Sequence, residues 1–96
     1  MLEIVRSSTF AAWLKTLKDV RAKARIAVRI DRLAQSNPGD VKPVGSGLSE
    51  LRIDYGPGYR VYFTKQGKLL IFILAGGDKS TQEKDIQTAI KLASNL

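Results

Sequence analysis

The side chains best suited to chemistry lie in two stretches where polar and apolar residues alternate. Alternation places Arg52 and Arg60 on one side of a predicted hairpin, together with the Tyr62 phenol and the Glu50 carboxylate. Guanidinium groups bind phosphate oxygens in a bidentate manner, and a tyrosine ring can stack on a nucleobase. The pattern therefore predicts a sheet face that binds phosphate. Ordinary cross-strand ion pairing and aromatic packing are the alternative explanation.

The pairing expected across this hairpin follows from its turns. If residues 56–58 form a three-residue loop, Arg52 faces Tyr62 on the neighbouring strand. A two-residue turn after that strand would then place Ile73 opposite Arg60. The basic side chains would lie on an open sheet face above an apolar floor.

A basic loop is expected to join this group. The apolar run 69–75 should end as a strand at Gly76 and Gly77, and residues 80–83 fit the capping box of a following helix. Backbone amides at a helix N-terminus attract anions, and two glycines would allow an anion to approach closely. Lys79 lies in this loop. A plain turn with Ser80 as the helix cap is the alternative.

A second basic group follows a helical period. Four arginines, here called the arginine ridge, each precede an apolar position of one predicted helix: Arg21, Arg25, Arg29 and Arg32. Such a ridge can lie along a phosphate backbone or pair with acidic groups of a partner. A solvated helix face is the alternative. Lys42, which follows the helix, is a further candidate for contact with nucleic acid.

The elements that carry these side chains can be read from the period of the apolar residues. A short strand is expected at 2–5, followed by a helix whose apolar face begins at Phe10 and whose cap lies among residues 7–9. A second helix, with Asp19 as its cap, should end at residues 37–40. The short connection between the two helices indicates an antiparallel helical hairpin.

After residue 40 the apolar period changes to two, which is typical of strands. We expect strands on both sides of residues 56–58, a central strand at 69–75, an additional short strand at 41–44 and a last helix with Ile86 and Ala89 on its apolar face. Helices grouped before an antiparallel meander indicate the α+β class. The prediction is one domain over residues 1–96: an N-terminal helical hairpin packed on an antiparallel sheet, with a C-terminal helix.

The composition narrows the classes of function. Sixteen lysines and arginines against nine acidic residues give a net charge of +7, which attracts polyanions, nucleic acid first among them. The chain has no cysteine and no histidine, which excludes disulfides, thiol nucleophiles and imidazole proton carriers. It also excludes the usual zinc and haem sites, so we expect neither a metal nor a cofactor.

Neither a membrane span nor a signal peptide is predicted. The longest apolar run, residues 69–75, is far too short to cross a bilayer. The N-terminal stretch carries an acidic residue early and is too short for a signal peptide. We therefore expect a cytoplasmic protein that does not contact the membrane.

Four segments in combination resemble the RelE/ParE toxin superfamily, in particular its HigB-like, phage-related "addiction module killer" branch. They are Gly-Asp-Val-Lys at 39–42, Gly-Leu-Ser-Glu-Leu-Arg at 47–52, Gly-Pro-Gly-Tyr-Arg-Val-Tyr-Phe at 56–63 and Gly-Gly-Asp-Lys-Ser-Thr-Gln at 76–82. The resemblance implies a small α+β toxin held inactive by an antitoxin, usually a small helix-turn-helix protein. RelE- and HigB-type members cut mRNA in the ribosomal A site, whereas ParE-type members poison DNA gyrase.

The resemblance also implies roles for individual residues. Arg60 matches the family's arginine after Gly-Tyr and would stabilise the phosphate during cleavage, with Arg52 and Lys79 in support. Glu50, Asp54 and Asp78 are candidates for acid–base work. RNA-cutting members often carry a histidine or tyrosine in the last segment; this chain has neither after Lys79, and Tyr62 is the candidate substitute.

The expected function is that of a toxin that stops translation by ribosome-dependent cleavage of mRNA. A gyrase-directed toxin and an inactive basic binding protein with the same fold are the alternatives. On an exposed sheet face Arg60 would add little to stability. Arg60→Ala is therefore expected to abolish toxicity and leave the fold intact.

Overall fold

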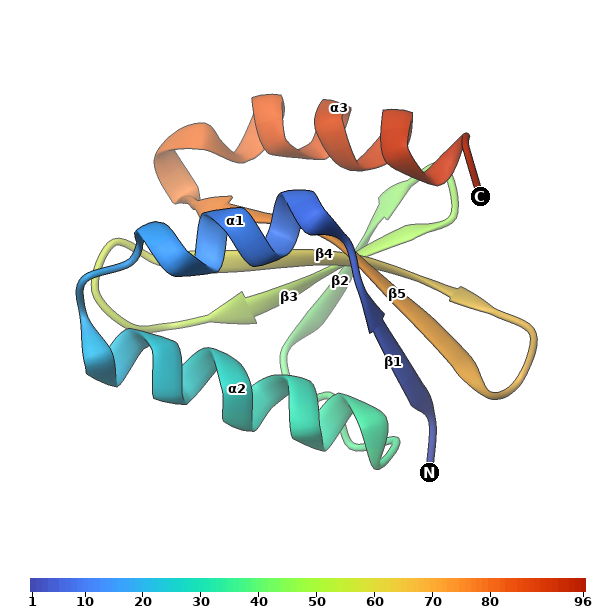
Figure 1. Cartoon of the computed structure of the whole chain (residues 1–96), viewed down its shortest axis with the longest axis horizontal. Helices are drawn as coiled ribbons and strands as arrows, with labels where there is room; N and C mark the ends of the chain where they lie inside the picture. The colour runs from blue at the N-terminus through green and yellow to red at the C-terminus, as the bar shows by residue number, and fades with distance from the viewer.

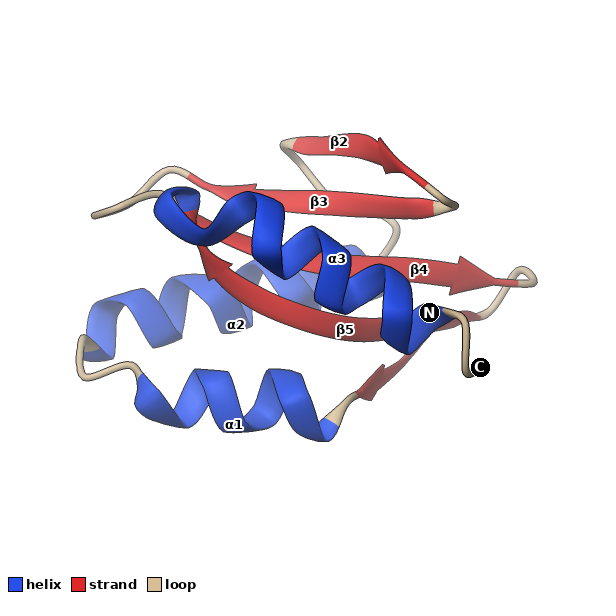
Figure 2. Ribbon diagram, turned by 90° about the horizontal axis from the view of Figure 1, so that it is seen from above, coloured by secondary structure: helices blue, strands red, loops and turns tan.

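One five-stranded sheet carries the other elements of the chain, and the computed structural model describes all of residues 1–96 (Figure 1). The strand order is β1-β5-β4-β3-β2. The strands are β1 (Glu3–Arg6), β2 (Val41–Gly45), β3 (Leu48–Ile53), β4 (Tyr59–Gln66) and β5 (Leu70–Asp78). Figure 2 shows β2 to β5 side by side. The additional short strand expected at 41–44 is confirmed as β2.

The sheet is mostly antiparallel, as expected, with one parallel pair at its edge. β1 runs parallel to β5, while the other neighbouring pairs are antiparallel. No short turn joins β1 to β5, so no hairpin sets the direction of β1. The α+β class itself is confirmed.

Three helices cover the two faces of the sheet. α1 (Ser8–Thr16) and α2 (Val20–Ala34) form the expected hairpin, and α3 (Gln82–Ala93) lies on the opposite side of the strands from α2 (Figures 1 and 2). Ser7 and Asp19 cap the first two helices, because their side chains accept hydrogen bonds from backbone N–H groups in the first turn. None of the three helices is long and apolar enough to cross a membrane.

The core is divided by the sheet into two clusters. The larger one holds Phe10 of α1 together with the apolar face of α2, where the predicted positions Ala22, Ile26, Ile30 and Leu33 are all buried. The smaller one lies under α3 and consists of Leu48, Tyr62, Leu74, Ala75 and Ala89. Tyr62 thus belongs to the core beneath α3.

The pairing between strands differs from the predicted register by two residues. Residues 54–58 form the loop between β3 and β4, so Arg52 pairs with Arg60. Tyr55 lies outside the ladder, and its hydroxyl donates a hydrogen bond to the Asp19 carboxylate of the helical hairpin, 3.1 Å away. The expected pairing of Arg52 with Tyr62 is therefore wrong.

The end of β5 also departs from expectation. The strand continues through Gly76 and Gly77 to Asp78. The turn before it spans residues 67–69, and a bulge lies between Tyr62 and Phe63, so Gly77 lies opposite Arg60 in place of Ile73. No apolar floor underlies the arginines.

Close packing explains the two glycines. A Cβ at Gly76 would overlap the Trp13 ring of α1, and one at Gly77 would overlap Asp85 and Thr81 beside α3. The glycines allow both helices to approach the same strand from opposite faces. The expectation that they admit an anion is wrong.

The predicted capping box is wrong as well. A short 3₁₀ turn, Lys79–Thr81, follows β5, and Asp78 caps it by accepting a hydrogen bond from the Ser80 N–H. α3 then begins at Gln82 without a side-chain cap.

Candidate phosphate-binding site

A polar hollow of about 390 Å³ lies where the β3–β4 loop meets the end of β5. Pro57 carries the one apolar side chain in its lining. Its lining consists of Asp40, Arg52, Asp54, Gly56, Pro57, Gly58, Arg60 and Lys79. The three cationic residues expected from the sequence to act together therefore surround one space, together with two carboxylates.

The loop backbone brings Arg60 and Lys79 together. Gly58 has a φ of +82°, and a Cβ built on it would lie 3.5 Å from Arg60 Nη1 and 3.6 Å from Lys79 Cβ. Lys79 is exposed, whereas Arg60 is buried and only 7% exposed. Arg60 Nη1 also donates to the Tyr59 carbonyl at 3.1 Å. One exposed ammonium group and one buried guanidinium group thus border the same hollow.

Glu50 lies behind the hollow and is 1% exposed. Its Oε1 is 3.5 Å from Arg60 Nε and 3.8 Å from Arg52 Nε, and its Oε2 accepts a hydrogen bond from Gln82 Nε2 at 2.6 Å. The sequence predicted an open sheet face here; that prediction is wrong because α3 covers it. Glu50 does not line the hollow and serves as the buried counter-charge of the two arginines.

Tyr62 lies deeper under α3 and is 0% exposed. Burial, followed by the nearby Glu50 carboxylate, raises its pKa far above the ordinary tyrosine value, although its hydroxyl makes no hydrogen bond of ordinary geometry. The phenol is therefore neutral at physiological pH and unavailable for stacking. The expected role of Tyr62 as base or stacking group does not fit this position.

The carboxylates that do reach the hollow are Asp40 and Asp54. Asp40 lies 3.9 Å from Arg52 Nε, and its carbonyl accepts a hydrogen bond from the Arg52 N–H at 3.0 Å. Reasoning from the sequence considered Asp54 and overlooked Asp40, which comes from the segment after α2. The pairing of β2 with β3 brings Asp40 into place, and the pattern around residue 40 carries no signal of that pairing.

The arginine ridge divides into structural and free members. Arg29 donates to three backbone carbonyls, those of Arg52 at 2.6 Å, Pro38 at 2.9 Å and Asp40 at 3.2 Å. It holds the segment after α2 against β3, so its guanidinium is already occupied. The Arg25 guanidinium lies over the Tyr55 ring, 4.6 Å from the centroid.

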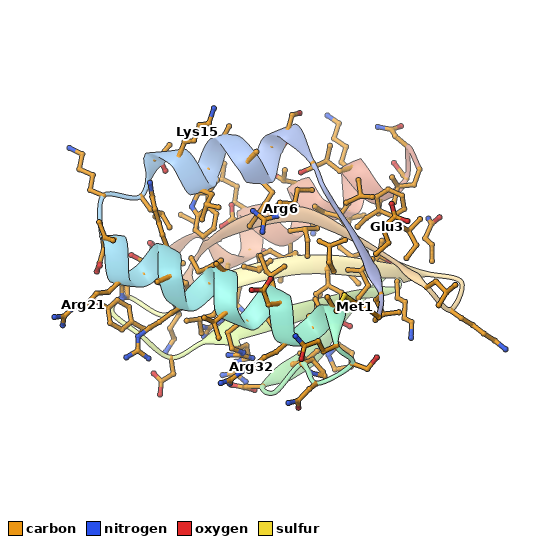
Figure 3. The ribbon with its side chains drawn as sticks, turned by 60° about the horizontal axis from the view of Figure 1, so that its bottom comes forward. Met1, Glu3, Arg6, Lys15, Arg21 and Arg32 are labelled. Atoms are coloured by element: carbon orange, nitrogen blue, oxygen red, sulfur yellow. The ribbon has the colours of Figure 1, made fainter.

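The other candidate contacts of the ridge are exposed. Arg21 and Arg32 lie on α2, and Figure 3 shows the Arg21 side chain extending away from the sheet. Lys42 is exposed on β2, opposite Glu50 in the ladder.

A second hollow, of about 420 Å³, adjoins the first. It is lined by Ala24, Arg25, Val28, Arg29, Arg32, Ile53 and Asp54. Asp54 belongs to both hollows, so a basic depression extends from α2 across the β3–β4 hairpin to Lys79.

Two similarities to known proteins accompany this geometry. Residues 12–96 match the model of the family described as "Phage derived protein Gp49-like (DUF891)". An uncharacterized protein of Haemophilus influenzae is 53% identical over 95 residues, covering 99% of this chain and 96% of the relative. The family match includes all residues of the two hollows.

Proposed function

The chain belongs to the phage-derived Gp49-like family, which is related to the RelE and HigB toxins, and from this premise we propose that it is the toxin of a type II toxin–antitoxin pair. It inhibits translation by cutting mRNA on the ribosome. The observation that carries the proposal is the hollow in which Arg52, Arg60 and Lys79 surround one predominantly polar space.

The chemistry follows from these groups. The ribose 2′-OH attacks the adjacent phosphorus, the bond to the 5′-oxygen breaks, and a 2′,3′-cyclic phosphate and a 5′-hydroxyl result. The guanidinium groups of Arg52 and Arg60 stabilise the negative charge that accumulates on the phosphate oxygens. The chain has no histidine, so a carboxylate of the hollow, Asp54 or Asp40, accepts the 2′-OH proton. Lys79, the one ammonium group of the hollow, protonates the leaving oxygen.

The ribosome supplies what this set of groups lacks. Holding the mRNA in the reactive geometry lowers the barrier without an additional catalytic side chain. The second hollow and the exposed arginines of α2 then bind the RNA backbone on one side of the cut. The partner that silences the protein is a cognate antitoxin, a small helix-turn-helix protein with an acidic or amphipathic segment that covers the basic depression.

Induced expression of the chain alone tests the proposal. We expect growth to stop, protein synthesis to fail before DNA synthesis, and primer extension to reveal new mRNA 5′ ends on ribosomes. Lys79→Ala should lower cleavage at least about 10-fold. Lys68→Ala is the matched control, because this exposed lysine lies in the turn at the other end of β4 and β5.

Other outcomes would redirect the assignment. Loss of DNA synthesis with intact mRNA would indicate a gyrase-directed toxin. Unimpaired growth with both syntheses intact would indicate a basic binding protein without toxicity. If Lys79→Ala and Lys68→Ala change mRNA cleavage equally, the hollow is not the cleavage site.

A further inference from the structure

We infer that Gln82 is a positioning residue: its side-chain amide holds the buried Glu50 carboxylate in the orientation that aims Arg60 and Arg52 at the hollow. The effect on activity rests on the proposed function, whereas the effect on the arginines does not. Gln82 is the first residue of α3 and is half-buried. It does not line the hollow.

The first step of the argument concerns the hydrogen bonds of Glu50. The bond from Gln82 Nε2, at 2.6 Å, is the only side-chain hydrogen bond that this carboxylate accepts within the chain. The two arginine Nε atoms lie at 3.5 and 3.8 Å, and neither makes a hydrogen bond. Electrostatic attraction holds the arginines to Glu50, but a short directional bond from Gln82 fixes where the carboxylate points.

The second step concerns the edge of each guanidinium that Glu50 occupies. In both arginines the contact is to Nε, which lies on the chain side of the group. For Arg60 the terminal nitrogens extend toward Gly58 at the wall of the hollow. Glu50 thus holds the arginines from behind and leaves their outer N–H groups for phosphate. A rotation of the carboxylate would move both guanidinium groups.

The third step is the charge that surrounds Glu50. Within the sheet, Glu50 is faced by four side chains. They are Arg52 of the same strand, Arg60 and Tyr62 of β4, and Lys42 across the ladder on β2. Asp40 reaches the group through Arg52. From α3 come Gln82 and the Asp85 carboxylate, which acts on Tyr62. Gln82 is therefore the one uncharged group that donates a hydrogen bond to Glu50, and a new side chain at this position keeps that bond only if it carries a donor.

Two substitutions of similar size should differ in how Arg60 responds to pH. Gln82→Met removes the donor. The Glu50 carboxylate then lacks its one directional hydrogen bond at every pH, so Arg60 loses order throughout the range. Gln82→Glu adds a carboxylate that repels Glu50 at alkaline pH. Once protonated at lower pH, the introduced carboxyl group becomes a donor and restores the bond.

The experiment follows the Arg60 Nε–H by nitrogen-15 NMR, through its hydrogen exchange and relaxation, between about pH 5.5 and pH 8.5. In the wild type we expect Arg60 to be ordered across this range. In Gln82→Met, Arg60 should be less ordered than in the wild type at every pH, and in Gln82→Glu it should gain order as the pH falls. Gln87→Met and Gln87→Glu are the controls, because Gln87 is an exposed glutamine of the same helix. Both control variants should behave as the wild type.

Cleavage of ribosome-bound mRNA is measured on the same proteins. The rate should follow the order of Arg60, with at least about a 10-fold loss where Arg60 is mobile. If Arg60 is equally ordered in all proteins at every pH, Gln82 is not a positioning residue. If Arg60 responds as expected and no variant cleaves RNA, the positioning role stands and the proposed function fails. Should Gln82→Met not fold, the recovery of Gln82→Glu on acidification decides the question.

Discussion

The guanidinium of Arg60 has two roles that a single substitution does not separate. It faces the hollow with its terminal nitrogens and neutralises Glu50, which is 1% exposed. A charged group left without its partner in a protein interior is strongly destabilising. Because Arg60 is itself 7% exposed, the stability of Arg60→Ala cannot be assumed to match that of the wild type.

We predict that Arg60→Ala lowers the free energy of unfolding by about 3 kcal/mol, since Glu50 keeps only Arg52 and Gln82. The double variant Arg60→Met with Glu50→Leu should lose clearly less, because no buried charge remains. Urea unfolding of both proteins measures the difference. A wild-type stability for Arg60→Ala would contradict the buried ion pair. Lys79, which is exposed, is therefore the better residue for testing cleavage without loss of stability.

The neutral phenol of Tyr62 yields a prediction at alkaline pH. Its pKa is raised in the folded protein by burial and by Glu50, relative to an ordinary value of about 10. A raised pKa contributes stability that is fully present below about pH 10 and is lost as the pH rises beyond that value. Tyr62→Phe should therefore unfold at a higher pH than the wild type. It should retain its stability at neutral pH, since the hydroxyl makes no hydrogen bond of ordinary geometry. Alkaline titration followed by circular dichroism tests this, and an identical midpoint in both proteins would contradict it.

At the scale of elements, strand β5 is packed by a helix on each face. Trp13 of α1 lies against Gly76, and its ring also packs near Phe10 and Tyr59, with centroids 5.8 and 6.2 Å away. On the other face, Thr81 and Asp85 share a hydrogen bond and lie against Gly77. Neither glycine has a positive φ, so steric space, and not backbone freedom, requires them.

We predict that Gly76→Ala destabilises the fold by about 1–3 kcal/mol, because the added methyl overlaps the Trp13 ring. The same substitution should cost less in a Trp13→Leu background, where the ring is absent. A double-mutant cycle by thermal unfolding gives the coupling between the two positions. Additive effects would show that the ring and the glycine do not depend on each other.

At the scale of the whole molecule, the net charge of +7 includes cationic side chains that are already bound within the fold and others that are free to contact a polyanion. Arg29 is committed to backbone carbonyls and Arg25 to the Tyr55 ring, while Arg21 and Arg32 remain exposed at the two ends of α2. Charge reversal at Arg29 would disturb the fold. A test of the ridge should therefore use the exposed pair.

We predict that Arg21→Glu with Arg32→Glu weakens ribosome binding at low salt by about 10-fold or more and makes it less dependent on salt. Lys65→Glu with Lys68→Glu is the control, since it changes the charge equally at the far end of β4. Binding is measured by sedimentation over a series of salt concentrations. Equal losses in both proteins would mean that net charge alone matters and that the ridge is a solvated face.

Local patterns determined the elements and which side chains share a face. The caps Ser7 and Asp19 and the apolar face of α2 follow from sequence spacing alone. Arg52 and Arg60 share a sheet face even though their predicted partners were wrong. The register error was two residues, and a shift of two leaves each side chain on its original face.

Tertiary structure decided which of these side chains are accessible. Alternation cannot reveal that α3 covers Glu50 and Tyr62, because that contact joins residues more than twenty positions apart. Helical spacing places Arg29 and Arg32 on the same ridge of the helix. Residues 38–40 nevertheless pack against Arg29 and accept its hydrogen bonds, whereas Arg32 stays exposed. The period of apolar residues in the sequence specifies the direction in which a side chain points from its own helix or strand. Whether that side chain is buried depends on which other element packs against it on that side.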